Sequence, residues 1–237
     1  MLIDLDYIYK ALDELTYEAN SKSSTYYNQD GIKVPRVTEV LSRMIHSDGL
    51  MYWANNMGLK GYKYKDLMTT AANIGTYAHK AIEIYLRDNI NTEDNIPFQG
   101  FLMWYNILTK EQGLSVEVVY VEHKLACKWF GGTLDCLMKI NGKYYLLDFK
   151  TSNYVTFSYF LQLAAYRYML YVTEGIIIDG IIVLQLCKDE PGFNEYMLVC
   201  SNPEHMTFIN HCEITFMSLV YAFYNLQETE AMYKEIF

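Results

Sequence analysis

The 237-residue sequence has no excess of basic residues, no long apolar run and no closely spaced cysteine pair. Its 19 basic and 28 acidic residues give a formal charge of −9, which excludes a polybasic nucleic-acid coat protein. The acidity by itself also argues against a nucleic-acid partner, because phosphate affinity usually comes from an excess of lysine and arginine. With 51% apolar residues the chain can bury a substantial core, which excludes a disordered tail.

The five cysteines contain no C-x-x-C element, so we expect reduced thiols, no disulfide framework and no zinc ribbon. The most apolar stretch, residues 176–186, is interrupted by Asp179 and is shorter than the roughly 20 residues of a membrane span. Asp4 and Asp6 lie where a signal peptide would be basic and then apolar. We therefore expect a cytoplasmic protein, in the host cytoplasm if the chain is viral, with no membrane partner.

The hydrophobic pattern predicts a mixed fold of helices and strands. Helical spacing of apolar residues predicts helices over residues 3–19, 73–88, 97–111 and 155–172, and from about 203. Strands are predicted over residues 116–127, 132–140, 143–150, 179–186 and 195–200. This order predicts an α/β (α+β mixed) fold, in which helices flank a central mixed sheet with an antiparallel meander. We place a helical N-terminal subdomain, packed on the core, at residues 1–70, and the core with its C-terminal helix at 71–237.

Asn141-Gly142 lies between two alternating runs and is the strongest short-range signal for a β-hairpin. A two-residue loop at this position sets a register that brings Asp135 opposite Asp148. Cβ atoms of directly opposed residues lie about 4.5–5.5 Å apart, and like charges placed there destabilise a sheet. Both aspartates also lie in otherwise apolar strands, so desolvation adds to the cost. The register therefore predicts that the two carboxylates serve a function, because their position lowers the stability of the sheet.

Lys150 follows two residues after Asp148 and shares its face of the strand, so it joins the two aspartates in one polar cluster. Two close carboxylates favour a hard divalent cation, and oxygen ligands select Mg²⁺ or Mn²⁺. A lysine beside such a metal can orient or deprotonate a water, which is what phosphodiester hydrolysis requires. The alternative is a surface hairpin with solvated aspartates and an ion-paired Lys150, because D-x-K alone is a weak motif.

Four motifs in order resemble the PD-(D/E)XK nuclease superfamily, specifically its RecB-like exonuclease branch of the phage type. They are Asp135, the LLDFKTS segment at residues 146–152, an upstream G-x-x-x-H at residues 75–79 and a downstream Q-x-x-x-Y at residues 162–166. Residues 34–44 and 49–58 are similar to the N-terminal region of phage-encoded members. The resemblance implies a restriction-endonuclease-like core of helix, three-stranded meander, helix and strand, plus an N-terminal helical subdomain.

The resemblance also implies roles for individual residues. His79, Asp135 and Asp148 would coordinate the catalytic metal, with the main-chain carbonyl of Phe149 as a further ligand. Lys150 would position the attacking water and stabilise the developing charge. Asp135, Asp148 and Lys150 are thus the catalytic residues that the resemblance implies.

The downstream motif implies contacts with the nucleic acid. Gln162 and Tyr166 lie one helical turn apart, and they would hold DNA or support the lysine. Thr151, directly after the lysine of the third motif, is a further candidate for contact with DNA.

Two glutamates are accessory candidates. Glu83, one turn after His79, either reaches the same site or pairs with Lys80 or Arg87. Glu122, on the strand before the hairpin, is a candidate for contact with a second metal or a water, and the alternative is a solvated strand glutamate.

The sequence departs from the family pattern in ways that limit its cofactors. The proline of the family's proline-aspartate doublet is replaced by Leu134, which is common in this branch. Without a C-x-x-C element we expect no iron–sulfur cluster. Without a G-x-x-x-x-G-K-[ST] loop we expect no bound nucleotide.

These observations together predict a Mg²⁺-dependent DNA exonuclease, with Mn²⁺ as a substitute, that processes or recombines viral, phage or mobile-element DNA from linear single- or double-stranded ends. The alternatives are a structure-specific endonuclease of the same superfamily and a non-catalytic DNA-binding or scaffold module. Residues 174–237 carry two basic and ten acidic residues, a charge of −8, which leaves −1 for residues 1–173. We expect the acidic C-terminal segment to face away from DNA or toward a protein partner.

Overall fold

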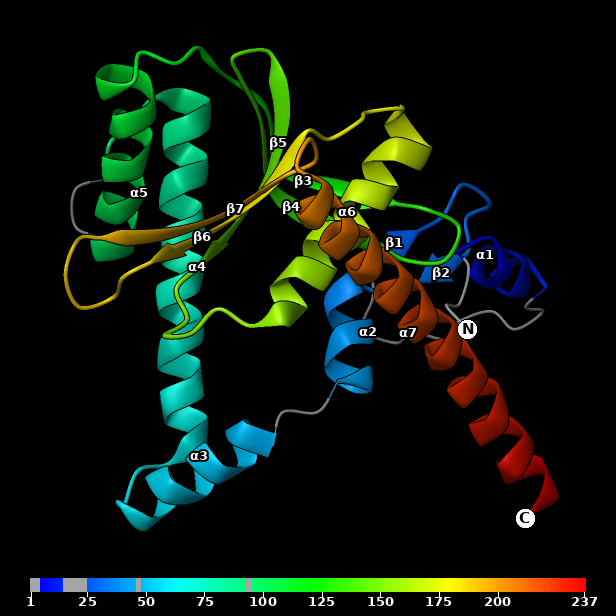
Figure 1. Cartoon of the computed structure of the whole chain (residues 1–237). Helices are drawn as coiled ribbons and strands as arrows, with labels where there is room; N and C mark the ends of the chain where they lie inside the picture. Colours follow the sequence, from blue (N-terminus) through cyan, green and yellow to red (C-terminus); the bar gives the residue numbers. More distant parts are fainter. Residues whose placement is uncertain (1–4, 15–24, 46–47, 93–94) are drawn as a thin grey trace.

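The computed structural model describes residues 5–14, 25–45, 48–92 and 95–237. Its centre is a five-stranded sheet in the order β3-β4-β5-β6-β7, with helices on both faces (Figure 1). Neighbouring strands are antiparallel except β5 and β6, which are parallel. The predicted mixed α/β class with an antiparallel meander is therefore confirmed. The strands are Val116–Ala126 (β3), Gly131–Ile140 (β4), Lys143–Lys150 (β5), Gly180–Leu186 (β6) and Phe193–Val199 (β7).

The turn between β4 and β5 has the predicted two-residue loop. Asn141 and Gly142 have φ values of 51° and 79°, and a type I′ turn requires positive φ at both positions. Pairing begins directly beside this loop and runs to Cys136 opposite Leu147. The register predicted from the sequence is confirmed over that range.

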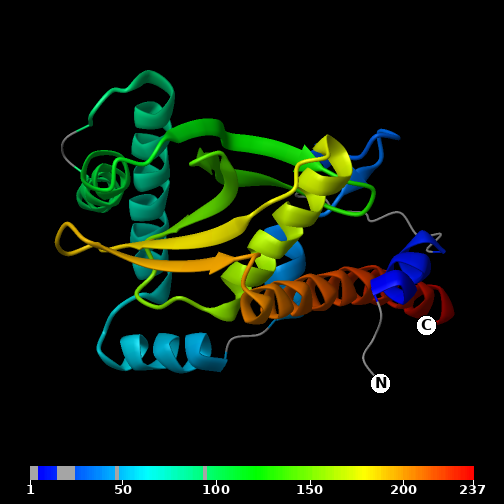
Figure 2. The same cartoon turned by 45° about the horizontal axis from the view of Figure 1, so that its top comes forward.

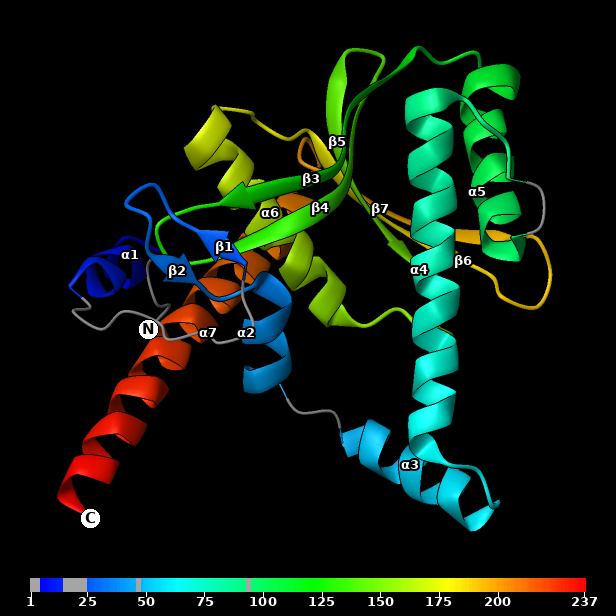
Figure 3. The same cartoon turned by 180° about the vertical axis from the view of Figure 1, so that it is seen from behind.

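Each face of the sheet is covered by its own helices, which bury separate apolar clusters (Figure 3). One face carries α4 (Tyr64–Asp88) and α5 (Ile96–Asn106), which continues as the π-helix Ile107–Glu111. The other carries α6 (Phe157–Glu174) and α7 (Pro203–Ile236), with α1 (Leu5–Asp13) and α2 (Val37–Met44) packed on α7. Among the described residues, no helix combines the length and the apolar run needed to cross a membrane.

The sheet opens into a fork between β4 and β5. Beyond the pair of Cys136 and Leu147, β4 stays paired with β3, and β5 stays paired with β6 (Figure 2). Asp135 is the residue of β4 next to that pair, and Asp148 is the corresponding residue of β5. Both predicted carboxylates therefore lie where the two halves of the sheet separate.

The N-terminal region differs from the predicted helical subdomain. Strands β1 (Tyr26–Tyr27) and β2 (Lys33–Val34) form a small hairpin on β4, where Tyr26 Oη lies 2.7 Å from Thr133 Oγ1. The boundary predicted between residues 70 and 71 lies inside α4. Residues 64–77, in the first half of α4, bury no side chain. Of the helix predicted over residues 3–19, residues 3–4 and 15–19 lie outside the described residues.

Candidate metal centre

Three carboxylates, one each on β3, β4 and β5, lie where the sheet opens. The β3–β4 ladder is paired on both sides of the position where Glu122 faces Asp135. The β4–β5 ladder ends at Cys136 and Leu147, so the predicted pair of Asp135 and Asp148 lies just beyond the paired part of the hairpin, although Asp135 is near enough to help raise the pKa of Asp148. Each strand thus contributes one acidic side chain at the level where the sheet opens. Such an alignment of like charges is unfavourable unless a proton or a cation neutralises part of it.

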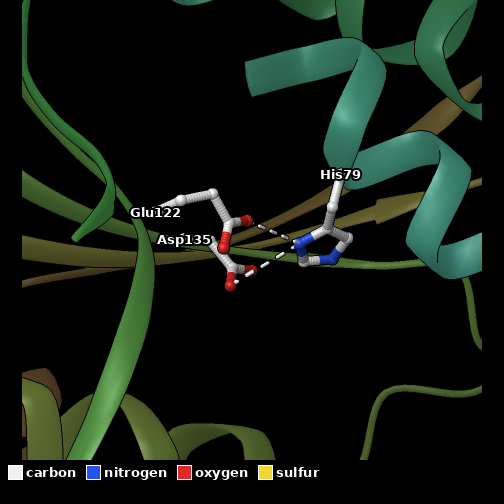
Figure 4. A group of neighbouring side chains, drawn as sticks. All are labelled: His79, Glu122 and Asp135. Carbon is white, nitrogen blue, oxygen red and sulfur yellow. Dashed lines mark hydrogen bonds and ion pairs between the residues drawn. The ribbon is translucent and has the colours of Figure 1, made fainter. Parts of the chain in front are cut away.

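His79, on α4, completes the group. Its Nδ1 atom lies 3.3 Å from Glu122 Oε1 and 3.7 Å from Asp135 Oδ1 (Figure 4), and its Nε2 atom lies 2.9 Å from the carbonyl oxygen of Phe149. One ligand atom from each of His79, Glu122 and Asp135 lies within 4.8 Å of the others. Burial by itself lowers the pKa of His79, but the two carboxylates outweigh it and raise this pKa to about 9. At neutral pH the ring is therefore an imidazolium that donates from both nitrogens.

Glu122 has a backbone conformation that is rare outside glycine. Its φ of 48° lies in the left-handed region, which costs such a residue about 1–3 kcal/mol. The Glu122 carboxylate nevertheless lies against His79, on the side of the sheet that α4 covers. Strain of this kind clusters at functional sites. The sequence alone left Glu122 as an accessory candidate, because no local pattern predicts a positive φ inside a strand.

Asp135 is held in place by the neighbouring strand. Its side chain is buried, and its Oδ2 atom accepts a hydrogen bond of 2.7 Å from the Phe149 N–H. This bond spans the fork where the ladder between β4 and β5 has ended. Asp135 thereby anchors the main chain at Phe149, and the carbonyl of the same residue, in the next peptide unit, faces His79.

Asp148 is almost fully buried, with 1% of its surface exposed. Lys150 Nζ donates a hydrogen bond of 2.7 Å to Asp148 Oδ1 and lies 2.6 Å from Oδ2. That second approach lacks hydrogen-bond geometry, and Oδ2 has no hydrogen-bond partner among the described residues. Burial raises the pKa of Asp148 to about 6, an effect that Lys150 opposes and Asp135 reinforces. Both oxygens of Asp148 therefore lie against the Lys150 ammonium, and this ion pair partly neutralises the buried charge.

Lys150 is held between a carboxylate and an aromatic ring. Its ammonium lies over the ring of Tyr159, 4.9 Å from the ring centroid. Burial by itself lowers the pKa of Lys150, but the charges of Asp148 and Asp135 outweigh it and raise this pKa. Lys150 therefore stays protonated and can orient a water as a donor, but cannot serve as a base in this state.

Two predicted DNA-contact residues, Gln162 and Tyr166, lie beneath the carboxylates on α6, hydrogen-bonded to each other and buried. Burial, and then the charges of Asp135 and Asp148, raise the pKa of Tyr166, so its hydroxyl stays neutral. Their position fits support of the acidic cluster better than direct contact with DNA.

Thr151, directly after β5, is half-buried. It lies beside Gly75 of the upstream motif, where an added Cβ atom would be 3.4 Å from Thr151 Oγ1. The upstream motif and the segment that follows Lys150 are thus neighbours in the fold, although Gly75 and Thr151 are 76 residues apart in the sequence.

The remaining accessory candidate, Glu83, pairs with Lys80 at 2.9 Å and with Arg87 at 3.4 Å on its own helix. This is the ion-pair alternative that the sequence left open. Sequence reasoning missed Gln185, which lies opposite Lys150 on β6 and donates a hydrogen bond of 2.7 Å to the carbonyl oxygen of Ser152. A lone polar residue in an otherwise apolar strand was a signal that could have identified it.

Gly132 provides the space that Tyr166 occupies. A Cβ atom at residue 132 would lie 2.6 Å from Tyr166 Cε1 and 2.9 Å from its hydroxyl oxygen. We expect Gly132→Ala to lower the free energy of unfolding by about 1–3 kcal/mol through this overpacking, measured by urea denaturation. Gly58→Ala, where a Cβ would meet nothing within 4 Å, is the control and should be neutral or stabilising by up to about 1 kcal/mol. Equal stability of the Gly132→Ala variant and the wild type would contradict this packing.

No protein-family model matches the sequence, and no curated protein matches it. Among solved structures 17 chains match, including the one described as "Crystal structure of SSO0001". The identity to that chain is 14%, the match covers 89% of this chain and 83% of that chain, and the TM-score is 0.34. At this TM-score the likeness carries no argument about fold or function.

Proposed function

We propose that this protein is a metal-dependent deoxyribonuclease with a PD-(D/E)XK core, of the RecB-like exonuclease branch. The observation that carries the proposal is the convergence of His79, Glu122 and Asp135 with the Asp148–Lys150 pair at the fork of the sheet. Motifs spread over residues 75–166 thereby meet at one place. The setting in viral or mobile-element DNA processing stays a prediction.

The donor set fits a hard divalent cation. His79, Glu122, Asp135 and Asp148 would hold it, together with the carbonyl of Phe149. The cluster of His79, Glu122 and Asp135, whose ligand atoms lie within 4.8 Å of one another, supports this assignment, and carboxylate oxygens with one imidazole suit Mg²⁺ or Mn²⁺. When bound, such a cation supplies a Lewis acid that neutralises charge developing on a phosphodiester.

The protein's own side chains have separate tasks in this proposal. Lys150 donates from Nζ to the attacking water and stabilises negative charge on the phosphate. Asp148 holds the lysine ammonium in place through Oδ1. Asp135 anchors the main chain of β5 at the Phe149 N–H. Tyr166 closes the cluster from the side of α6 and excludes water from the carboxylates.

The first test compares linear with covalently closed DNA in one reaction. We expect the purified protein with Mg²⁺ or Mn²⁺ to degrade the linear form and leave the closed circle intact, because an exonuclease acts from ends. Gel electrophoresis measures both forms, and linearising the circle should restore its degradation. Cutting of the closed circle would favour the structure-specific endonuclease. Absence of cleavage, together with no heat of Mn²⁺ binding in calorimetry, would favour a non-catalytic DNA-binding or scaffold module.

A further inference from the structure

Helix α3 (Asp48–Leu59) and the first half of α4 stand away from the sheet (Figures 1 and 3). We call residues 51–77 the helical arm. None of these residues is buried, and the two helices touch through an edge-to-face contact of Trp53 and Tyr64, with ring centroids 5.9 Å apart. Helices in proteins are stabilised mainly by packing an apolar face. The arm therefore has a large surface available to a partner.

The surface of the helical arm is rich in exposed aromatic side chains. The exposed fractions are 72% for Tyr52, 57% for Tyr62 and 66% for Tyr77. Met51 and Leu59 are exposed on the same arm. Exposed apolar patches can mark interaction surfaces, and flat aromatic rings are suited to stacking.

The arm is also basic in an acidic protein. Residues 51–77 contain three lysines and one aspartate, a charge of +2. Since the whole chain carries −9, the other residues together carry −11. Lys60, Lys63 and Lys65 form no ion pair with any described side chain. This charge disfavours pairing of two arms with each other and favours a polyanion.

Helix α4 leads directly from the arm to the metal centre. Tyr77 lies two residues before His79, and Lys80 follows it. From Tyr64 to His79 the helix rises about 22 Å at roughly 1.5 Å per residue. A ligand that follows α4 from the arm therefore reaches the level of His79 along the helix axis, although Tyr77, two residues earlier, faces another side of the helix than His79.

We propose that the helical arm binds single-stranded DNA and guides it to the metal centre. Tyr52, Tyr62 and Tyr77 stack on unpaired bases, and the arm lysines contact phosphates. A single strand is the form that fits, because bases in a duplex are already stacked on one another. Guidance of the strand to the metal centre rests on the proposed nuclease function. Binding of the strand to the arm is measured without cleavage.

Stacking of the arm tyrosines on bases is tested by fluorescence anisotropy in EDTA, so that no metal supports cleavage. The probe is a labelled oligothymidine of about 20 nucleotides, longer than the roughly 4–16 nucleotides that comparable stacking platforms cover. We expect Tyr52→Ala, Tyr62→Ala and Tyr77→Ala each to weaken binding about tenfold. Tyr233→Ala removes a ring that is 62% exposed on α7 and should leave the affinity unchanged. Circular dichroism checks that the arm variants keep their helices.

The contacts of the arm lysines with phosphates are tested by the salt dependence of oligothymidine binding. A variant with Lys60→Gln, Lys63→Gln and Lys65→Gln should reduce the slope of log affinity against log salt by about 2, at roughly 0.7 for each single-strand phosphate contact. Lys143→Gln, at the exposed tip of the β4–β5 hairpin, is the matched control and should leave the slope unchanged.

Three results would overturn the proposal: wild-type affinity in every arm variant, tighter binding to a duplex of the same length, or preference for phosphatidylserine vesicles over the oligonucleotide. Asp148→Asn separates this proposal from the nuclease proposal, because we expect that variant to lose cleavage and still bind the oligonucleotide. A wild-type protein that binds through the arm but never cleaves DNA would contradict the nuclease proposal and support the arm proposal.

Discussion

We expect Asp148→Asn to reduce DNA cleavage by about a thousandfold while the protein stays folded. The substitution keeps the shape of the side chain but removes the buried charge that holds the Lys150 ammonium at the fork. A bound cation supplies several kcal/mol of charge stabilisation in such reactions, and about 1.4 kcal/mol corresponds to tenfold in rate. The measurement is the release of acid-soluble nucleotides from linear DNA in Mg²⁺.

Matched variants make this result specific. Asp189→Asn, in the loop between β6 and β7, changes an exposed aspartate and should leave the rate unchanged. Lys150→Ala should reduce the rate of DNA cleavage by a comparable factor, because it removes the hydrogen-bond donor to the attacking water. Wild-type rates in both Asp148→Asn and Lys150→Ala, with a retained melting transition, would refute the assignment of the catalytic residues.

We expect the metal-free protein to lose stability as the pH rises through the titrations of Asp148 and His79. Folding raises the pKa of Asp148 from 3.8 to about 6, mainly through burial. It raises the pKa of His79 from 6.5 to about 9, because the carboxylates outweigh burial. In both cases the folded state binds the proton more tightly, so the stabilising contribution is complete below the unfolded pKa. That contribution is lost first as the pH passes 6 and then as it passes 9.

A divalent cation should reverse this trend, because it competes with protons for the same ligands. We expect Mn²⁺ to raise the melting temperature relative to EDTA, and to raise it more at pH 8 than at pH 5. Thermal melts by circular dichroism between pH 5 and pH 9 measure both effects. His79→Gln should remove the upper part of the pH dependence, while His211→Gln, at an exposed position, should retain it. Equal melting temperatures with and without Mn²⁺ at pH 8 would contradict the metal centre.

The parts of this site that were predictable depend on short stretches of sequence. Asn141-Gly142 fixes the turn between β4 and β5, and the period of two along a strand then places Asp135, Asp148 and Lys150. Glu122 was less predictable, because its contact with His79 involves a positive φ inside β3. Strand pattern alone cannot distinguish such a residue from a solvated glutamate.

The same distinction applies to the fold as a whole. The sequence by itself determined the order of elements from α5 to α7 and the register of the hairpin beside its turn, because hydrophobic period and turn type are local properties. Only the tertiary structure decided that β4 and β5 part at the two aspartates, and that His79 meets the carbonyl of Phe149. It also decided that residues 51–77 bury nothing. These features arise from contacts, or missing contacts, between segments far apart in the chain, and no local pattern specifies which surface of a helix another segment will cover.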